Sequence, residues 1–177
     1  MTEEADAGDI VSQRTLPIDP DDTALTLYRK MVAVAVKLFG ETYPLLKTGR
    51  APRIPQDAAA ATVFGRRTPE DGLVRWHWPA ARVHNLIRGV THPYPGAFTH
   101  FRGKRLFLWD ARPVTVNGHG AILPGAVIEV RAGQGLLVGT GSGSLLLVRV
   151  QLDSEEELAG DEFARRHGVG SGQRLGG

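Results

Sequence analysis

Two adjacent arginines, Arg66 and Arg67 in the stretch FGRRTP, are candidates to hold a charged substrate. Each planar guanidinium group can donate two parallel hydrogen bonds to phosphate oxygens, so a pair of arginines suits a diphosphate. Asn85 and Arg88 lie on a helix expected shortly afterwards and are candidates to line the same cleft. The alternative is that these side chains are solvated at the surface, or that an arginine stacks on a nearby tryptophan.

Several other chemistries are excluded or disfavoured by the composition. The 177 residues include no cysteine, so disulfides, thiol nucleophiles and cysteine zinc sites are excluded, and a cytoplasmic location is the natural expectation. The six histidines show no metal-ligand spacing, so no metal site is expected. The formal charge is only +2, and the basic residues are scattered along the chain. A dedicated nucleic-acid protein usually has a concentrated basic face instead. No apolar run approaches the ~20 residues of a membrane span, and no membrane partner is expected.

A long helix is the strongest element that the sequence predicts. Its pattern begins near Thr23, and Asp21 or Asp22 is the expected N-cap, because a carboxylate there can accept a bond from a free backbone N–H. Pro44 should kink the last turns, and Gly49 is a plausible left-handed stop. The apolar face of this helix comprises Tyr28, Met31, Ala35, Leu38 and Phe39. The helix is therefore expected to be amphipathic.

The second half of the chain is richer in strands. A second helix is expected to begin at Pro79, with a buried stripe of Val83, Leu86, Ile87 and Val90. The junction THPYPG at 91–96 ends it, because its two prolines forbid helix continuation. We expect a domain boundary at this junction. After it, about five short strands with glycine-rich turns, in about 60 residues, suggest a small closed or partly open barrel. GTGSGS at 139–144 joins two of these strands and is expected to be a hairpin turn rather than a phosphate-binding loop.

Four stretches, spread in order over nearly the whole chain, resemble one known family. They are DAGDIVSQRTLPIDPDDTALTLYRKM (6–31), FGRRTPEDGLVRW (64–76), LIRGVTHPYPGAFTHFRGKRLFLWDAR (86–112) and VQLDSEEELAGDEFARRHG (150–168). The family is that of the 10-formyltetrahydrofolate-dependent formyltransferases, which includes methionyl-tRNA formyltransferase and enzymes that formylate nucleotide-linked amino sugars. The resemblance implies an α+β chain, in which the remnant of an α/β, Rossmann-like formyltransferase domain precedes a small OB-like β-barrel. Residues 1–92 would be the C-terminal part of the catalytic domain plus the inter-domain segment, and residues 93–177 the barrel domain.

The resemblance also implies a catalytic residue. The family's reaction is attack of a substrate amine on the formyl group of 10-formyltetrahydrofolate, and an asparagine, a histidine and an aspartate carry it out. The aspartate belongs to an Asp-x-Gly motif after an acidic stretch, which here matches Asp6 in EEADAGD. It would orient and charge-stabilise the histidine and help to manage the proton. Glu3, Glu4 and Ala5 are implied as cofactor contacts, because the same loop lines the pterin pocket in relatives.

The sequence departs from the family at its beginning. The family's asparagine and histidine lie upstream of the aspartate, and here only five residues precede Asp6. A full member needs about 130 more residues, enough for a doubly wound parallel domain. We therefore expect Met1 to be an internal methionine, through a misplaced start or a truncated gene, and the 177-residue chain to be inactive alone. The genomic sequence upstream of Met1, read in frame, tests this expectation.

The burial of apolar side chains leads to a related expectation. A strand expected from Gly8 to Leu16 would lack a sheet partner from its own domain, and the long helix would lose the sheet that it should cover. At about 25 cal/mol per Å² of apolar surface, several unburied large side chains cost on the order of 10 kcal/mol, comparable with the stability of a domain. The first half should therefore be loose or prone to association in isolation.

Three functions remain open. The first is N-formylation of a nucleotide-linked amino sugar, such as a UDP-4-amino-4-deoxy-arabinose-like compound, because the sugar-modifying relatives also tend to show FGRRTP. The second is formylation of methionyl-tRNA, in which the barrel would contact RNA. The third is a non-catalytic binding module that keeps the OB-like barrel. The sequence does not indicate the oligomeric state.

Overall fold

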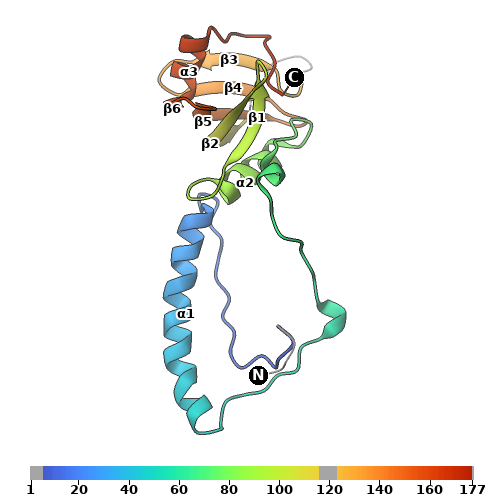
Figure 1. Cartoon of the computed structure of the whole chain (residues 1–177), viewed down its shortest axis with the longest axis vertical. Coiled ribbons are helices and arrows are strands. Elements are labelled where there is room, and N and C mark those ends of the chain that lie inside the picture. The colour runs from blue at the N-terminus through green and yellow to red at the C-terminus, as the bar shows by residue number, and fades with distance from the viewer. Residues whose placement is uncertain (1–5, 116–122, 177) are drawn as a thin grey trace. The chain divides into compact units, whose positions relative to one another are not determined.

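The chain divides into two compact units, Met1–Arg66 and Arg67–Gly177, in a computed structural model that describes residues 6–115 and 123–176 (Figure 1). Helices and an antiparallel sheet occur together, which confirms the α+β class. The OB-like barrel and the Rossmann-like remnant are not confirmed. The predicted domain boundary at residue 92 stays a prediction.

The first unit contains one long α-helix, α1 (Ala24–Lys47), and a short 3₁₀-helix, η1 (Ala58–Ala60). The N-cap of α1 is Thr23, so the expectation of Asp21 or Asp22 was wrong. Thr23 caps the helix because its hydroxyl oxygen accepts a hydrogen bond from the Thr26 N–H, while the Thr26 hydroxyl oxygen accepts one from the Thr23 N–H, which forms a capping box. Gly49 has a φ of 67° just after the helix, in agreement with a left-handed stop.

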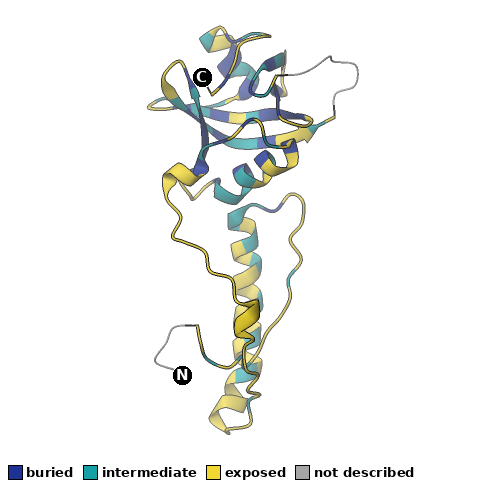
Figure 2. Cartoon of the chain, turned by 90° about the vertical axis from the view of Figure 1, so that its right-hand side faces the viewer, coloured by how far each residue is buried: buried dark blue, intermediate teal, exposed yellow. Residues whose placement is uncertain are grey.

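No residue of α1 is buried (Figure 2). Many of its large apolar side chains are exposed, including Tyr28, Met31 and Phe39 of the predicted apolar face, whereas Leu38 of that face is half-buried. The strand expected from Gly8 to Leu16 did not form. Only Ile10 pairs there, in an isolated antiparallel bridge with Ile54.

The second unit is built on one antiparallel sheet. Its strands are β1 (Ala97–Phe101), β2 (Lys104–Val114), β3 (Val127–Arg131), β4 (Gly135–Gly139), β5 (Ser144–Leu152) and β6 (Glu157–Ala159). The strands follow the order β1-β2-β5-β4-β3, and β6 pairs with β5. The helices of the unit are η2 (Pro69–Gly72), α2 (Ala80–Val90) and α3 (Gly160–His167). GTGSGS lies in the β4–β5 hairpin, as expected.

The core of the second unit lies between the sheet and its two α-helices. Alternate residues of β2, Leu106 and Leu108, are fully buried, and β4 is buried along its whole length. The helix α2 contributes Val83 and Ile87, and α3 contributes Phe163. Figure 2 shows this concentration of buried residues in the sheet unit. The amphipathic pattern of α2 predicted from the sequence is thereby confirmed, since its inward residues are the ones in the core.

The C-terminal segment contacts both outer strands of the sheet path. Val127 N–H, at the start of β3, donates to the Gln173 carbonyl at 2.8 Å, and Leu175 N–H donates to the Gly125 carbonyl at 2.9 Å. Gly176 N–H then donates to the His100 carbonyl of β1 at 2.8 Å. These bonds satisfy edge groups that would otherwise be open to another strand. No helix in the described part of the chain is long and apolar enough to cross a membrane.

Candidate functional site

The turn that carries Asp6, the predicted catalytic aspartate, is held by a distant glutamine. Asp6 is exposed and has a backbone φ of 60°. The main-chain oxygens of Asp6 and Gly8 both accept hydrogen bonds from Gln56 Nε2, each at 2.7 Å. Ile10 and Ile54 exchange two main-chain bonds of 2.8 and 3.1 Å beside the turn. The carboxylate of Asp6 therefore sits on a tied backbone at the surface, where it is accessible to a partner group.

The other implied folate contacts, Glu3, Glu4 and Ala5, lie outside the described residues. Their role, and the catalytic role of Asp6, stay predictions.

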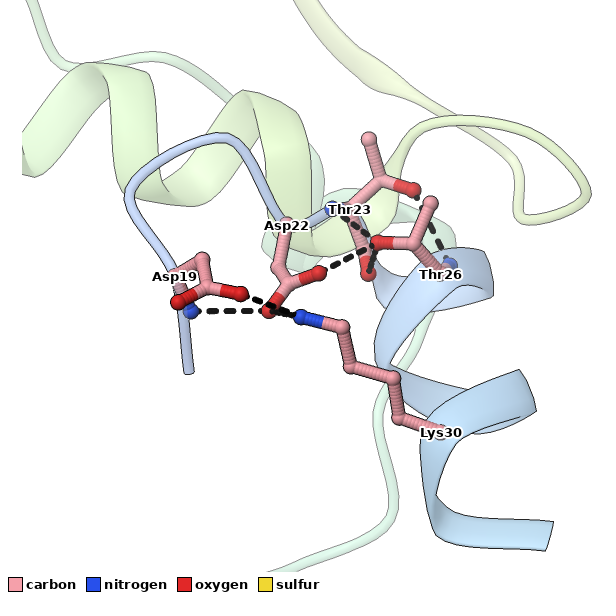
Figure 3. A network of polar contacts seen from close by, with 5 residues as sticks. All are labelled: Asp19, Asp22, Thr23, Thr26 and Lys30. Carbon is pink, nitrogen blue, oxygen red and sulfur yellow. Dashed lines mark hydrogen bonds and ion pairs between the residues drawn. The ribbon is translucent and has the colours of Figure 1, made fainter. Parts of the chain in front are cut away.

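A cluster of charged and hydroxyl groups fixes the start of α1 (Figure 3). Lys30 Nζ lies 2.5 Å from a carboxylate oxygen of Asp19 and 2.7 Å from one of Asp22. Asp22 also accepts hydrogen bonds from the Asp19 backbone N–H at 2.8 Å and from the Thr26 hydroxyl at 2.9 Å. The first turn of the helix is thus tied to the segment before it by side chains on both sides of Thr23.

The electrostatics of this cluster favour its charged form. The hydrogen bond from Lys30 is the main cause that lowers the pKa of Asp22 to about 2, and the bonds from Asp19 N–H and Thr26 add to it against an opposing effect of burial. The pKa of Lys30 is raised, chiefly by its bond to Asp19 and then by that to Asp22. Groups that stay ionised at neutral pH are poor proton donors or acceptors, so the cluster acts as a structural anchor.

The structure brings together two of the four predicted substrate-binding residues. Asn85 and Arg88 lie one turn apart on α2, and Arg88 Nε donates to Asn85 Oδ1 at 2.8 Å. Arg66 ends the first unit and Arg67 begins the second, and both side chains are exposed. The pKa of Asp71 is lowered first by the Thr68 backbone N–H and hydroxyl, and then by the charge of Arg67. The role of these four residues in binding stays a prediction.

An arginine outside those four stacks on a tryptophan. The guanidinium carbon of Arg82 lies 3.9 Å from the centroid of the Trp78 ring, in a cation–π contact. Arg82 is exposed and Trp78 is half-buried, so the arginine covers part of the ring.

The junction at residues 91–96 is built around Trp109, which the sequence analysis did not single out. The His92 ring stacks on the Trp109 ring, with centroids 3.8 Å apart and an interplanar angle of 14°. The Thr91 hydroxyl donates to the Trp109 carbonyl at 2.8 Å. Gly96 lies so close that a Cβ there would be 2.6 Å from an indole carbon, and its φ of 89° also favours glycine. The junction therefore packs against β2 at Trp109.

Polar side chains surround this tryptophan. Trp109 Nε1 donates to Gln151 Oε1 at 3.0 Å, and His92 Nε2 lies 3.3 Å from a carboxylate oxygen of Glu157. Arg149 Nε donates to the other oxygen of Glu157. Burial acts to raise the pKa of Glu157, but the hydrogen bonds from Arg149 and His92 outweigh it, and the pKa is lowered. The cluster therefore ties the junction to β5 and β6.

In the sequence, the feature that could have indicated this cluster is the alternation of residue types in KRLFLWD. Leu106 and Leu108 are fully buried, and the half-buried Phe107 and Trp109 lie between and beyond them on the opposite face of β2. Two aromatic residues on the outward face of a strand indicate that something covers them. Over residues 6–115 and 123–176, no group of three or more His, Asp or Glu side chains could hold a metal ion.

The two α-helices, the antiparallel sheet and the proline–glycine junction define a small α+β domain of the kind found at the C-terminus of formyltransferases. The family model for the formyl transferase C-terminal domain matches residues 66–168, more than half of the chain. The chain belongs to this family, as a C-terminal portion of a formyltransferase.

Solved structures show the same fold. A variant of HypX from Aquifex aeolicus has a TM-score of 0.69 and 21% identity, with 98% of this chain and 30% of that chain covered. HypX in complex with tetrahydrofolic acid has a TM-score of 0.66 and 23% identity, with 92% of this chain and 28% of that chain covered. Methionyl-tRNA formyltransferase from Clostridium thermocellum has a TM-score of 0.51 and 28% identity, with 67% and 49% covered. The chain thus spans less than a third of HypX and about half of the methionyl-tRNA formyltransferase.

Proposed function

We propose that this chain forms part of an N-formyltransferase, which transfers a formyl group from 10-formyltetrahydrofolate to a primary amine. The match of residues 66–168 to the formyl transferase C-terminal domain carries this proposal. The tetrahydrofolate complex of HypX, a protein of the same fold, supports a folate as the formyl donor. Residues 1–92 are assigned to the end of the catalytic domain and the inter-domain segment, and residues 93–177 to an OB-like C-terminal domain. The enzyme is proposed to work in the cytoplasm.

The reaction exchanges one carbon–nitrogen bond for another. The amine nitrogen attacks the formyl carbon, and the bond from that carbon to N10 of the folate breaks. The amine loses one proton and N10 gains one, so the products are a formamide and tetrahydrofolate. Asp6 is proposed to orient and charge-stabilise the histidine that manages this proton, and that histidine and the oxyanion-binding asparagine are supplied by sequence upstream of Asp6.

The acceptor proposed first is a nucleotide-linked amino sugar, such as a UDP-4-amino-4-deoxy-arabinose-like compound. The exposed guanidinium groups of Arg66 and Arg67 suit its diphosphate, and Asn85 with Arg88 supplies a further donor set on α2. Methionyl-tRNA is the second candidate, because a methionyl-tRNA formyltransferase is among the proteins with this fold. A non-catalytic OB-like binding module is the third.

The test compares the 177-residue chain with the same chain extended upstream of Met1 by in-frame genomic coding sequence. Formyl transfer from 10-formyltetrahydrofolate is expected only in the extended chain. Asp6→Asn should lower its kcat by about 100-fold or more, whereas the matched control Asp9→Asn, at an exposed aspartate nearby, should not. Activity of the 177-residue chain alone would contradict the proposed division of the active site.

The same extended chain tests which acceptor receives the formyl group. A nucleotide amino sugar and methionyl-tRNA are offered in parallel, and the Arg66→Ala/Arg67→Ala double variant is expected to raise the KM for the sugar nucleotide. Transfer to methionyl-tRNA alone would establish the second candidate. If the extended chain transfers the formyl group to neither acceptor and does not bind the folate, the binding-module function replaces the first two candidates.

A further inference from the structure

Gln56 links two distant parts of the first unit, beside the Ile10–Ile54 bridge. Its Nε2 group donates to the carbonyl oxygens of Asp6 and Gly8, each at 2.7 Å, across 50 and 48 residues of sequence. A glutamine amide carries two N–H donors, and here both have a main-chain acceptor in one short turn.

The register of the neighbouring bridge explains why the side chain reaches both carbonyls. Ile10 pairs with Ile54 in an antiparallel bridge, so Gly8 is the residue opposite Gln56. A glycine has no side chain to keep a cross-strand neighbour away, and the Gln56 side chain can lie over its backbone. The side-chain amide thus continues the hydrogen bonding at the point where main-chain pairing ends.

The turn that Gln56 holds has a backbone conformation that needs support. Three non-glycine residues have positive φ in the described part of the chain: Asp6, Arg102 and Ser154. Arg102 lies in the β1–β2 turn and Ser154 between β5 and β6, where strand pairing on both sides fixes the backbone. Among the described residues, no strand adjoins Asp6, whose φ is 60°. A disfavoured conformation at a reactive residue persists only when neighbouring groups enforce it.

We infer that Gln56 is a positioning residue for Asp6: its amide holds the Asp6–Gly8 backbone in the left-handed turn and so sets the direction of the catalytic carboxylate. This inference rests on the proposed function. It requires donors, because both partners are carbonyl oxygens. Gln56→Glu keeps the shape but replaces two donors by acceptors, so it should release the turn. Gln13→Glu is the matched control, since Gln13 is an exposed glutamine of the same unit and the substitution adds the same charge.

The first experiment measures the turn itself in the 177-residue chain by NMR. The Gln56 side-chain amide protons are expected to exchange with solvent at least 10-fold more slowly than those of Gln13. Gln56→Glu should also speed exchange of the Ile10 and Ile54 backbone amides, which the bridge protects, and Gln13→Glu should not. Equal exchange of the two side chains, or unchanged exchange at the bridge in Gln56→Glu, would overturn the inference.

The second experiment measures formyl transfer in the upstream-extended chain. Gln56→Glu is expected to lower kcat by about 10- to 100-fold with KM for the folate changed less than about 2-fold, because misplacement of a catalytic group weakens the reaction more than binding. A loss of folding would raise KM or abolish soluble protein instead. If Asp6→Asn removes activity but Gln56→Glu leaves kcat unchanged, only the positioning role fails. If Asp6→Asn leaves activity intact, the proposed function fails first.

Discussion

Phe163 and Phe39 are phenylalanines on helices of the two units, and their surroundings differ completely. Phe163, in α3, is fully buried and packs edge-on against Phe101 at 5.3 Å between ring centroids. Phe39, in α1, is 62% exposed and stacks on its own helix neighbour Tyr43. The same residue type therefore contributes to a core in one unit and to an apolar surface in the other.

The comparison shows that an amphipathic pattern specifies a helix without specifying what covers it. The apolar residues of α2 find the sheet, so its inward face enters the core. Those of α1 lie on an equally regular helix, yet no residue of Ala24–Lys47 is buried. This agrees with the expectation from the sequence that the first half leaves apolar side chains in water. Most helical stability in proteins comes from packing of the apolar face, so α1 should be the less stable element.

Truncation of the two phenylalanines is expected to give the largest contrast. Phe163→Ala should destabilise the sheet unit by about 3–5 kcal/mol, because it removes a ring from a core that cannot refill the space. Phe39→Ala should change the stability of that unit by less than about 0.5 kcal/mol. Urea denaturation followed by tryptophan fluorescence measures this unit selectively, since Trp76, Trp78 and Trp109 all lie in it. A large effect of Phe39→Ala on that transition would break the comparison.

Two glycines provide a second contrast of smaller size. A Cβ on Gly141 would lie 1.8 Å from the His77 carbonyl oxygen, and the Gly141 N–H donates to the Trp76 carbonyl at 2.8 Å. Gly141→Ala should therefore push the β4–β5 turn away and cost about 1–3 kcal/mol in the same denaturation experiment. Gly40 lies inside α1 with open space around it, so Gly40→Ala should instead stabilise that helix by about 1 kcal/mol.

Circular dichroism at 222 nm checks the second of these changes. Gly40→Ala should raise the helical signal and its thermal midpoint, while the fluorescence transition of the sheet unit stays where it was. If Gly141→Ala leaves the sheet transition unchanged, the close approach of the turn to residues 76–78 does not contribute to stability.

The sequence predicted elements better than it predicted their partners. The long helix, its stop at Gly49, the inward face of α2 and the hairpin at GTGSGS were all found, because each depends on local periodicity or on a few turn residues. The strand from Gly8 to Leu16 was wrong, because β-branched residues alone do not supply a neighbouring strand.

For the candidate sites, too, the sequence indicated local features but not the distant residues that contact them. Asp6 could be singled out only through a family resemblance, because an aspartate before Ala-Gly is otherwise a turn residue. Gln56 carried no signal at all, since its partners are main-chain carbonyls 48 and 50 residues away. The Trp109 cluster is similar: its partners come from the junction, β5 and β6, and only the outward position of Trp109 in the strand was visible in the sequence.

The smallest expected effect concerns the anchor at the start of α1. Because its pKa is lowered from 3.8 to about 2, Asp22 stabilises the folded helix start fully above about pH 4 and loses this contribution as the pH falls through about 2. Lys30→Gln removes the main cause of the shift, so the pKa of Asp22 should rise toward 3.8. The side-chain carboxyl ¹³C titration of Asp22 measures this directly.

Lys37→Gln, at an exposed lysine of the same helix, is the control and should leave the titration unchanged. An unshifted Asp22 titration in Lys30→Gln would mean that the backbone N–H of Asp19 and the Thr26 hydroxyl hold the carboxylate by themselves, and that the start of α1 is anchored by hydrogen bonds rather than by charge.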